Sequence, residues 1–521
     1  MCAVRLRQQT DADVIIAGAG PAGATAAATL AGAGFSVIAL DSATFPRDKV
    51  CGDFVGPAAL LELHKLGITQ LGQYRKTNII REATLYLDGK QLINHPIPEV
   101  PGMPAHGRVI PRQELDDLIY KSAVDAGATT LERTRITDYQ TRDDGVHVNV
   151  VQSGEQRVLS CRLLLGADGI GSVVARGVRG GKPSRLDRII AVRAYYEGVP
   201  GPADRAELYF TSGSFPGYYW LFPTSGGGAN VGVGLLLETL PEVEAHPRDL
   251  LMQLVAKDPA LKARLGSARL KGKVKGWPLV TYNHRTPLVA DRVMLLGDAA
   301  GLINPLNGEG IQYAMQSGRW AAQTAALCLR RDDLSHDALE PYAERVAQAL
   351  RYDMALAGMI VQLIRNRSLN PVWLHALKII TTRAKADPQY ATTTGGVLAG
   401  LVEASAVLRP DILIGTARQA AFTEAFAVAR HAVRGPKHWA QFGKSSAKHT
   451  ASLVWENVRH PVALAQWGGG VASCAAELVS QVGANAMRQR KDDANEREAA
   501  PPSAAPPPTV RVRSYTSRSV Q

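Results

Sequence analysis

Three short segments of the chain combine glycines with an acid and could together bind a nucleotide. Residues 18–23 read GAGPAG, residues 166–169 read GADG and residues 297–301 read GDAAG. Each follows an apolar run of the kind that forms a buried parallel strand. Glycines after a strand let the backbone approach a phosphate, and a nearby acid can hold the hydroxyl groups of a sugar. In this order along one chain, the three segments predict a single site for a flavin dinucleotide.

The first segment has the form of a phosphate-binding turn. Gly18 permits a tight turn, and Gly20 lets the backbone approach a pyrophosphate. Gly23 lets the next helix lie close to the strand, so that the phosphates sit on a helix N-terminus. Asp41 stands 23 residues after Gly18, near the roughly 20 residues expected for an acid that binds ribose. A glycine turn in an ordinary α/β protein is the alternative, and the register of strand, helix and Asp41 favours the dinucleotide.

The two later segments place further acids at the ends of expected strands. Asp168 can reach a ribose or order the pyrophosphate loop, although an Asp-Gly pair by itself more often makes a turn. Asp298 is expected to accept a hydrogen bond from the ribityl chain. Residues 304–311 read NPLNGEGI and lead into a helix expected over 312–322, whose free N–H groups can face the flavin N1 and O2. The dipole of an exposed helix contributes only about 0.3–1 kcal/mol, so it tunes the flavin without creating its reactivity.

Strand-like and helical stretches alternate up to about residue 345 and indicate an α/β fold. Two segments within it, 83–87 and 189–196, are rich in β-forming residues and are interpreted as parts of one inserted sheet. After about residue 346 the chain is alanine-rich and helical, and its proline-rich end cannot bury a core. We therefore expect a Rossmann-like FAD-binding domain (1–75, 106–180 and 286–345), an inserted antiparallel substrate-binding sheet (76–105 and 181–285), a C-terminal helical region (346–487) and a disordered tail (488–521).

Composition and charge narrow the class of protein. The chain has 521 residues, 46% of them apolar and 20% charged, which is ordinary for a globular protein of several domains. Only +2 of the net charge of +12 belongs to residues 1–360. The basic C-terminal part contains no dense basic cluster or nucleic-acid module, so we expect no nucleic-acid partner. Basic residues among apolar ones at 363–367 and 374–380 fit a membrane surface or, as the alternative, a solvated helical face.

Targeting signals and metal motifs are not evident. Residues 1–10 are polar and lead directly into the first expected strand, which leaves no room for a secretory signal. No run reaches 18 uninterrupted apolar residues, and the nearest, around 395–408, contains Glu403. The five cysteines are dispersed without a CxxC pair, which argues against structural zinc, iron–sulfur ligation or disulfides. We expect a cytoplasmic protein, with peripheral association at the inner face of a membrane left open.

Further motifs give the chain a resemblance to one family. Residues 46–52 read PRDKVCG, and residues 218–223 read YYWLFP, followed after eight residues by GVG at 232–234. Together with the glycine segments and RQELD at 112–116, they resemble the geranylgeranyl reductase family of FAD-dependent oxidoreductases, within the p-hydroxybenzoate hydroxylase-like flavoprotein superfamily. The likeness covers roughly residues 10–415.

The resemblance implies a role for each matched residue. Reduced FAD would saturate isolated carbon–carbon double bonds of an isoprenoid lipid, and Cys51 would lie near the reacting face. The ADP half would be held by Gly18, Gly20, Gly23, Asp41, Arg112 and Asp168. The ribityl chain and isoalloxazine would face Asp298, Pro305, Gly308, Gly310 and Ile311. The lipid would lie against Tyr218, Trp220 and Phe222, with Gly232 and Gly234 letting the next strand pass close to flavin or substrate.

The aromatic stripe and Cys51 each have a plainer interpretation. Tyr218, Trp220 and Phe222 alternate along a strand and share one side of it, where such a stripe is often ordinary core. The Gly-x-Gly at matching distance favours a substrate cavity. Cys51 alone would be a small buried hydrophobe in most proteins. Because it follows two basic residues in a glycine-flanked loop, it could instead have a depressed thiol pKa and relay a proton.

Two rival functions and the electron donor stay open. The same fold supports an FAD monooxygenase that hydroxylates an aromatic or polyketide substrate, or a halogenase. A quinone-linked electron-transfer dehydrogenase is the second rival, although Cys328 and Cys474 are too few for the iron–sulfur domain of that group. No second dinucleotide fingerprint is present, so NAD(P)H, ferredoxin or a quinol could reduce the flavin. One methylene is worth only about 1–3 kcal/mol in an apolar slot, so we expect loose specificity among geranylgeranyl and polyprenyl-quinone lipids.

Overall fold

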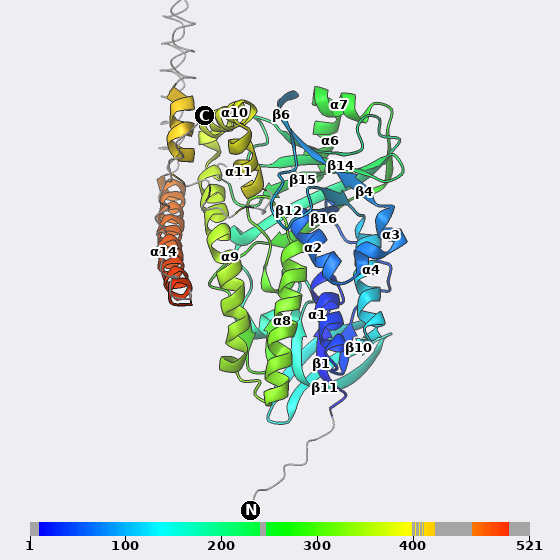
Figure 1. Ribbon diagram of the computed structural model, residues 1–521. Coiled ribbons are helices and arrows are strands. Elements are labelled where there is room, and N and C mark those ends of the chain that lie inside the picture. Colours follow the sequence, from blue (N-terminus) through cyan, green and yellow to red (C-terminus); the bar gives the residue numbers. More distant parts are fainter. Residues whose placement is uncertain are drawn as a thin grey trace, which may run out of the picture.

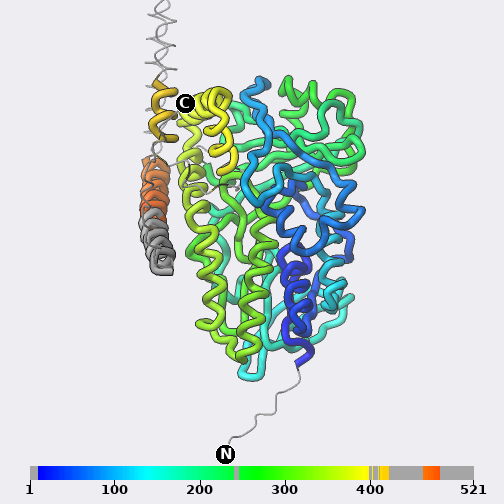
Figure 2. Tube along the Cα trace, in the orientation of Figure 1, coloured from blue at the N-terminus to red at the C-terminus, as the bar shows by residue number. Residues whose placement is uncertain are grey.

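The structure is a computed structural model that describes residues 10–239, 246–398, 402, 406, 409, 411–421 and 461–499. Two large sheets with their covering helices, and a set of C-terminal helices, make up this part of the chain (Figure 1). The colours along the trace show that segments distant in the sequence lie side by side in both halves of the molecule (Figure 2).

The eight-stranded sheet is built on a parallel core. Its three central strands are β11 (Glu155–Gly166), β1 (Ala12–Ala17) and β2 (Val37–Leu40). β1 pairs in parallel with both neighbours, with Val14 opposite Leu163 on one side and Val37 on the other. β1 and β2 are mostly buried, as expected for parallel strands that are covered on both faces. The remaining strands of this sheet are β8 (Thr129–Leu131), β9 (Thr134–Arg142), β10 (Gly145–Gln152), β17 (Val289–Ala290) and β18 (Val293–Leu295).

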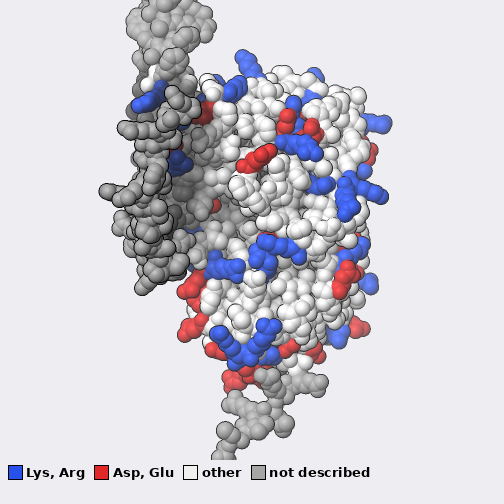
Figure 3. Space-filling view, in the orientation of Figure 1, with Lys and Arg blue, Asp and Glu red and all other residues white. Residues whose placement is uncertain are grey.

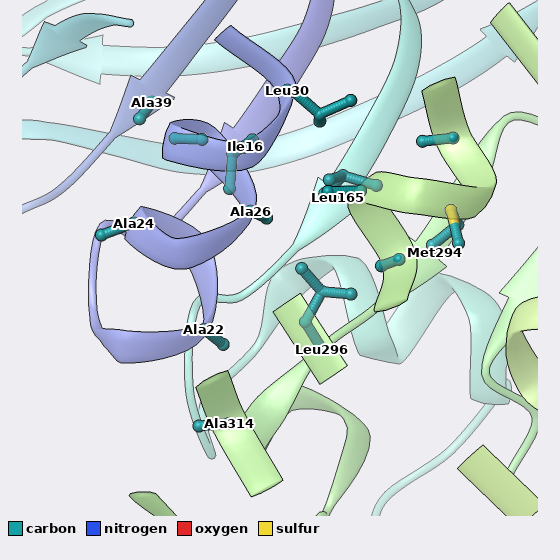
Figure 4. Packing of buried hydrophobic residues seen from close by; sticks show 14 of the residues in the cluster. Ile16, Ala22, Ala24, Ala26, Leu30, Ala39, Leu165, Met294, Leu296 and Ala314 are labelled. Carbon is teal, nitrogen blue, oxygen red and sulfur yellow. The ribbon is translucent and has the colours of Figure 1, made fainter. Parts of the chain in front are cut away.

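Helices cover this sheet through small residues. The longer ones are α1 (Pro21–Gly32), α4 (Arg112–Asp125) and α8 (Ile311–Arg331), and the shorter ones are α2 (Pro57–Lys65), α3 (Gly72–Arg75) and α5 (Val173–Arg179). A Cβ added at Gly318 of α8 would lie 2.3 Å from the carbonyl oxygen of Ala22 in α1. The two helices can therefore approach this closely only because residue 318 is glycine. Figure 4 shows the same junction from the core, where Ala22 and Ala314 lie close together beside Leu296.

The seven-stranded sheet joins two distant segments of the chain. Its order is β16-β12-β15-β14-β13-β5-β6. All neighbours pair antiparallel except β13 and β5, which pair in parallel where the earlier segment enters the sheet. One face is covered by α6 (Pro247–Lys257) and α7 (Pro259–Leu265). The strands are β5 (Glu82–Leu87), β6 (Lys90–Pro96), β12 (Arg188–Glu197), β13 (Arg205–Phe210), β14 (Tyr218–Thr224), β15 (Gly228–Leu236) and β16 (Arg269–Val280).

A small three-stranded sheet lies beside the loop that carries Cys51. Its strands are β3 (Phe54–Val55), β7 (Gly107–Val109) and β4 (Asn78–Ile80), with β7 in the middle. β4 thus lies outside the seven-stranded sheet, although its segment was expected to form that sheet. Because β3 begins three residues after Cys51, its pairing with β7 fixes one end of the Cys51 loop.

The C-terminal helices lie along one side of the molecule (Figure 1). They include α9 (His336–Ile364), α10 (Asn370–Ala386), α11 (Pro388–Leu398) and α14 (Pro461–Ala499). The helical region starts ten residues earlier than expected, because Ser335 caps α9 by accepting a hydrogen bond from the N–H of Ala338. α14 is held to α9 by an ion pair between Arg351 and Glu477 at 2.7 Å. The indole N–H of Trp467 also donates to the carbonyl of Gln362 over 2.8 Å.

α14 differs from the sequence-based expectation at its end. It continues to Ala499, so the disorder expected from residue 488 is wrong for residues 488–499. This stretch of the sequence is rich in helix-forming residues, and the helix ends just before the prolines at 501 and 502. Residues 500–521 of the expected tail lie outside the described residues.

The first half of α14 is long and apolar. Within the described residues, one helical stretch, Pro461–Gln481, is long and apolar enough to cross a membrane by length and composition, with a mean hydropathy of 1.2. Polar residues such as Gln466 and Glu477 interrupt its apolar sequence, so it contains no uninterrupted apolar run of 18 residues. Most of the 395–408 stretch that the sequence favoured lies outside the described residues.

Charged side chains on the face shown in Figure 3 are interspersed, with both signs on each half of the molecule. Neighbouring charges of opposite sign weaken the field of each over a distance of about a Debye length. The described part of this face therefore carries no continuous field of one sign.

Candidate active site

The glycine turn after β1 leaves no room for side chains. Gly18 has a φ of +96°, and a Cβ added to it would lie 2.3 Å from the carbonyl oxygen of Ala167. A Cβ at Gly23 would lie 1.8 Å from the carbonyl oxygen of Gly18. Gly20 is less constrained, since the nearest atom to its added Cβ belongs to the flexible side chain of Arg47, at 3.2 Å. The tight turn and the close helix contact thus require glycine at Gly18 and Gly23.

Asp41 lies directly after β2, beside this turn. Its carboxylate accepts hydrogen bonds from the N–H groups of Ala19 at 3.0 Å and Ala43 at 2.9 Å. The Nε of Arg47 lies 3.9 Å from the same carboxylate. The acid expected to hold ribose therefore also closes the glycine turn.

Arg112 begins a group of paired charges close to the turn. It donates two hydrogen bonds of 2.6 Å to Asp116, and Arg47 donates a third to the same carboxylate at 2.8 Å. Burial alone would lower the pKa of Arg112, but the charges of Asp116 and Asp298 and the hydrogen bonds to Asp116 hold this pKa above its ordinary value. Asp116 was missed in the sequence, although its i,i+4 spacing from Arg112 on an expected helix was a usable signal.

Lys49 and Asp298 form a second pair in this group, with 2.7 Å between Nζ and Oδ2. Burial would raise the pKa of Asp298, but Lys49, Arg112 and Arg47 hold it below its ordinary value. Asp298 is thus an anion that neighbouring cations stabilise. Lys49 was noted in the sequence only as a neighbour of Cys51, because its partner lies 249 residues away.

Asp168 caps a helix next to the turn. It accepts hydrogen bonds from the hydroxyl of Ser172 and, at 2.7 Å, from the N–H of Val173 at the start of α5. Burial raises the pKa of Asp168, although these hydrogen bonds oppose the rise. These hydrogen bonds fix the segment from Asp168 to the start of α5, and the role expected for Asp168 at the cofactor stays a prediction.

The loop before α8 lies between Asp298 and the aromatic strand β14. The hydroxyl of Tyr218 donates to the carbonyl of Asn307, and Gly308 has a φ of +72°. A Cβ at Gly310 would lie 3.8 Å from Asp298 Oδ1. This loop contains Pro305 and ends at Ile311, the first residue of α8. The free N–H groups at the start of α8 therefore open beside Asp298.

Three aromatic side chains of β14 lie on one side of the seven-stranded sheet. The ring centroids of Tyr218 and Trp220 are 6.1 Å apart, and those of Trp220 and Phe222 are 6.2 Å apart. Between them, Tyr219 and Leu221 point to the opposite side and join the core under α6 and α7. The alternation expected for this strand is thus present.

The glycine pair of β15 makes room for these aromatic rings. Gly232 lies opposite Trp220 and Gly234 lies opposite Tyr218. A Cβ at Gly232 would lie 2.1 Å from the Trp220 ring, whereas a Cβ at Gly234 would lie 3.5 Å from the Tyr218 ring. The close approach that Gly232 makes within the protein is therefore to Trp220.

The Cys51 loop packs directly on the aromatic rings. A Cβ at Gly52 would lie 3.4 Å from the indole nitrogen of Trp220 and 3.1 Å from the Phe222 ring. Asn230 of β15 donates to the carbonyl of Cys51 at 2.7 Å and accepts from the Trp220 indole at 2.9 Å. The structure thus brings the cysteine loop, the aromatic rings and the charge group of Lys49 into one region.

The thiol of Cys51 has a raised pKa, so the depressed pKa considered from the sequence is wrong. Burial is the largest cause; the charge of Asp53 also raises the thiol pKa, whereas Arg112 lowers it. The sequence showed the basic neighbours but not the burial. A thiol with a raised pKa stays protonated near neutral pH, so Cys51 can hold a proton and is not a thiolate nucleophile.

Two acids of this region were missed in the sequence, the fully buried Asp53 and the half-buried Glu309. Burial raises the pKa of Asp53 to about 6, although hydrogen bonds from Tyr195 and Asn230 oppose the rise. Burial also raises the pKa of Glu309 to about 8. An acid between two glycines was a usable signal for Glu309. Asp53 carried no such signal, because its partners Tyr195 and Asn230 lie 142 and 177 residues further along the chain.

The residues around the glycine turn fit the FAD that the motifs imply. Among the described residues, no side chain caps the N-terminus of α1, so its first N–H groups can bind an anion. A Cβ at Gly18 or Gly23 would collide with backbone, which keeps this cradle open. Arg47 and Arg112 add positive charge beside it.

Comparison with protein families and relatives supports this cofactor. The family model described as FAD binding domain matches residues 11–352. A menaquinone reductase of Mycolicibacterium smegmatis is 34% identical over 330 residues, which cover 60% of this chain and 76% of the relative. Digeranylgeranylglycerophospholipid reductase 2 of Methanopyrus kandleri is 32% identical over 343 residues, which cover 64% of this chain and 81% of the relative. FAD is therefore the cofactor of this fold.

Solved structures of two flavoprotein types share the fold. A geranylgeranyl bacteriochlorophyll reductase-like protein from Thermoplasma acidophilum matches with a TM-score of 0.60 and 21% identity, covering 78% of this chain and 99% of that protein. A flavin-dependent brominase matches with a TM-score of 0.61 and 20% identity, covering 80% of this chain and 99% of the brominase. At these identities the likeness shows the fold alone.

Proposed function

This chain belongs to the geranylgeranyl reductase family of FAD-dependent oxidoreductases, and from that premise we propose that it saturates carbon–carbon double bonds in the chain of an isoprenoid lipid. The names of its relatives, menaquinone reductase and digeranylgeranylglycerophospholipid reductase, support a lipid of geranylgeranyl or polyprenyl-quinone type. The observation that carries the proposal is the packing of the Cys51 loop on Trp220 and Phe222, next to the charge group around Asp298.

The residues that would hold FAD form two sets, one for the ADP half and one for the rest of the cofactor. The glycine turn with its neighbours would hold the ADP half, and the loop before α8 would lie at the isoalloxazine. When bound and reduced, the flavin supplies a hydride. The residues proposed for the ADP half are Gly18, Gly20, Gly23, Asp41, Arg112 and Asp168, and those proposed for the rest of the cofactor are Asp298, Pro305, Gly308, Gly310 and Ile311.

The aromatic rings would bind and orient the lipid chain. Tyr218, Trp220 and Phe222 offer an apolar face, and Gly232 and Gly234 let those rings pack on β15. An isolated alkene has no carbonyl group to polarise, so alignment and exclusion of water must supply most of the rate; good alignment contributes about 7–11 kcal/mol. The protonated thiol of Cys51 would donate a proton to one alkene carbon.

An anaerobic single-turnover experiment tests this function. Photoreduced protein is mixed with a menaquinone that carries an unsaturated polyprenyl tail, and the lipid is analysed by mass spectrometry. We expect a gain of two hydrogens for each reduced bond, with reoxidation of the flavin in equal amount. Substrate-stimulated oxygen consumption coupled to a hydroxylated product would instead identify a monooxygenase and overturn the proposal.

We further propose that the enzyme meets its lipid at the inner face of a membrane. Val462 and Val479 on α14 are 70% and 71% exposed, and Leu413 and Ile414 are about half exposed. Exposed apolar side chains on helices can enter the boundary between headgroups and acyl chains. Replacing Val462 and Val479 by glutamate should lower the fraction of protein that sediments with anionic vesicles. Equal sedimentation of the variant and the wild type would contradict this proposal.

A further inference from the structure

The row of aromatic rings on β14 continues onto the neighbouring strand and loop. The ring centroids of Tyr218 and Phe210 are 6.4 Å apart, and those of Phe210 and Phe215 are 6.2 Å apart. Tyr209, which alternates with Phe210 along β13, points to the opposite side of the sheet, into the core under α6 and α7. One aromatic row therefore crosses this face of the sheet; its members in order are Phe222, Trp220, Tyr218, Phe210 and Phe215.

The two ends of the aromatic row meet different parts of the chain. At one end, the Cys51 loop packs on Phe222 through Gly52. At the other end, the side-chain amide of Asn370 on α10 donates to the carbonyl of Phe215 at 2.7 Å. Trp373, also on α10, packs against the cluster that contains Phe215. The row thus joins the Cys51 loop to the C-terminal helical region, which the proposed mechanism has not used.

Two buried polar atoms of α10 have no partner among the described residues. They are Oδ1 of Asn370 and the indole nitrogen of Trp373. Asn370 is only 7% exposed, and its amide orientation is fixed because its nitrogen donates to Phe215. Oδ1 is therefore an unpaired acceptor, and the indole N–H is an unpaired donor. Such buried groups are costly and call for an explanation.

A hydroxyl group would satisfy both of these atoms. Asn370 and Trp373 are three positions apart on α10, so their side chains are neighbours on one face of the helix. A hydroxyl can accept a hydrogen bond from the indole N–H and donate one to the amide oxygen. A carbonyl or ether oxygen can only accept, so it would leave the oxygen of Asn370 unpaired.

We propose that Asn370 and Trp373 bind a hydroxyl group on the headgroup of the lipid, while its tail lies along the aromatic row toward Cys51. This inference rests on the proposed reduction of an isoprenoid chain and adds the place where the headgroup is held. A few polar groups at one end of an apolar site fix the orientation of a ligand.

The rings of the row are accessible to such a tail. Phe222, Tyr218 and Phe210 are each half-buried, although loops lie over the first two. Gly52 packs on Phe222, and the hydroxyl of Tyr218 donates to the carbonyl of Asn307. Apolar ring surface that stays accessible on this side of the sheet is the kind of surface that an isoprenoid chain covers.

Trp373→Phe tests the site because it removes the N–H and keeps an aromatic ring. Trp277→Phe is the matched control, since Trp277 is 43% exposed on β16, away from α10. The probes are geranylgeraniol, which carries a hydroxyl, and the hydrocarbon of the same chain without it. Their dissociation constants are measured by equilibrium dialysis against the full-length, FAD-loaded protein.

We expect Trp373→Phe to weaken binding of the alcohol by about 3- to 10-fold, the size of one neutral hydrogen bond. Binding of the hydrocarbon should not change, and Trp277→Phe should change neither constant. Equal weakening of both probes would show that Trp373 acts by packing alone and would overturn the inference. Unchanged binding of the alcohol would overturn it as well.

Competition against geranylgeraniol identifies the source of the hydroxyl. The competitors are digeranylgeranylglycerol and a naphthol with a geranylgeranyl tail, which resembles a quinol. The one that displaces the alcohol at lower concentration carries the headgroup that fits the site, and failure of both would contradict the site. Should the wild type reduce no lipid, the proposed function falls, while a loss confined to the alcohol in Trp373→Phe still establishes the site. Conversely, lipid reduction together with equal losses for both probes would leave the function and remove the site.

Discussion

The two sides of the candidate active site use polar residues in opposite ways. Around the glycine turn, cations lie in contact with carboxylates, and Lys49 with its neighbours holds the pKa of Asp298 below its ordinary value. Around the cysteine loop, burial dominates and raises the pKa values of both Cys51 and Asp53. One side thus favours the charged forms of its groups, as the binding of an anionic cofactor requires, and the other shifts Cys51 and Asp53 toward their protonated, neutral forms, as proton transfer in an apolar site requires.

The largest effect is expected at the glycine turn. Gly23→Ala forces a Cβ to within 1.8 Å of the carbonyl oxygen of Gly18, so the turn must open. We expect loss of bound FAD, measured by absorbance, and a decrease of about 3 kcal/mol in the free energy of unfolding. Gly32→Ala is the control, because Gly32 ends the same helix with nothing within 4 Å of its added Cβ. It should keep FAD and gain up to about 1 kcal/mol. Full FAD occupancy in Gly23→Ala would contradict the role assigned to the turn.

The second-largest effect should distinguish the glycine-turn side of the site from the cysteine-loop side. Gly232→Ala places a Cβ 2.1 Å from the Trp220 ring and 2.6 Å from the carbonyl oxygen of Val192, so the ring must move off the sheet. We expect FAD to stay bound while the rate of lipid reduction falls at least 10-fold. Gly234→Ala should lose less activity, since its Cβ would make an ordinary contact of 3.5 Å with Tyr218. If Gly232→Ala and Gly234→Ala lowered the rate of lipid reduction equally, the packing of Trp220 on Gly232 would not be what the reaction depends on.

The sequence predicted the parts of the site that are local in the chain. The glycine turn, the alternating rings of β14 and the loop before α8 are each encoded within about ten residues, so spacing alone indicated them. The ion pair of Lys49 with Asp298 and the network of Asp53 with Asn230 and Tyr195 join residues more than 140 positions apart. Only the fold brings these residues together.

The direction of the Cys51 pKa shift likewise could not be predicted from the sequence alone. Basic neighbours are visible in the sequence and favour a thiolate, whereas burial is a property of the folded chain and favours the thiol. Similarly, the parallel pairing of β13 with β5 depends on where a distant segment enters the sheet. Charge patterns could therefore be predicted, but not the environments that decide their effect.

On the cysteine-loop side, the free energy of unfolding should depend on pH through Asp53. The pKa of Asp53 is about 6 in the folded protein against an ordinary value of 3.8. Between these values the folded state binds more protons than the unfolded state, so stability falls as the pH rises from about 4 to 6 and stays lower above. The shift corresponds to a loss on the order of 3 kcal/mol. Asp53→Asn should abolish this fall in thermal melts from pH 4 to 8. Asp88→Asn, which changes an exposed residue, should show the same pH dependence as the wild type. If the two variants had the same pH dependence, the prediction would be contradicted.

The smallest effect is expected on the charged side, with the opposite dependence on pH. Asp298 has a lower pKa in the folded protein than in the unfolded chain. Its ionised form therefore adds to the free energy of unfolding at every pH above its ordinary pKa. This stabilisation is lost as the pH falls through the pKa that Asp298 has in the folded protein. Lys49→Met removes the closest cation and leaves the burial, so the pKa of Asp298 should rise and stability should be lost at a higher pH. We expect the acid limb of thermal melts between pH 3 and 6 to move upward by about one pH unit, since a nearby opposite charge typically lowers a carboxyl pKa by about 1–3 units. Lys65→Met is the control: Lys65 is 40% exposed, and Arg319 still donates two hydrogen bonds to its partner Glu62. If Lys49→Met left the acid limb where the control leaves it, the cation would not be what keeps Asp298 ionised, and the distinction between a charged side and a neutral side would lose its basis.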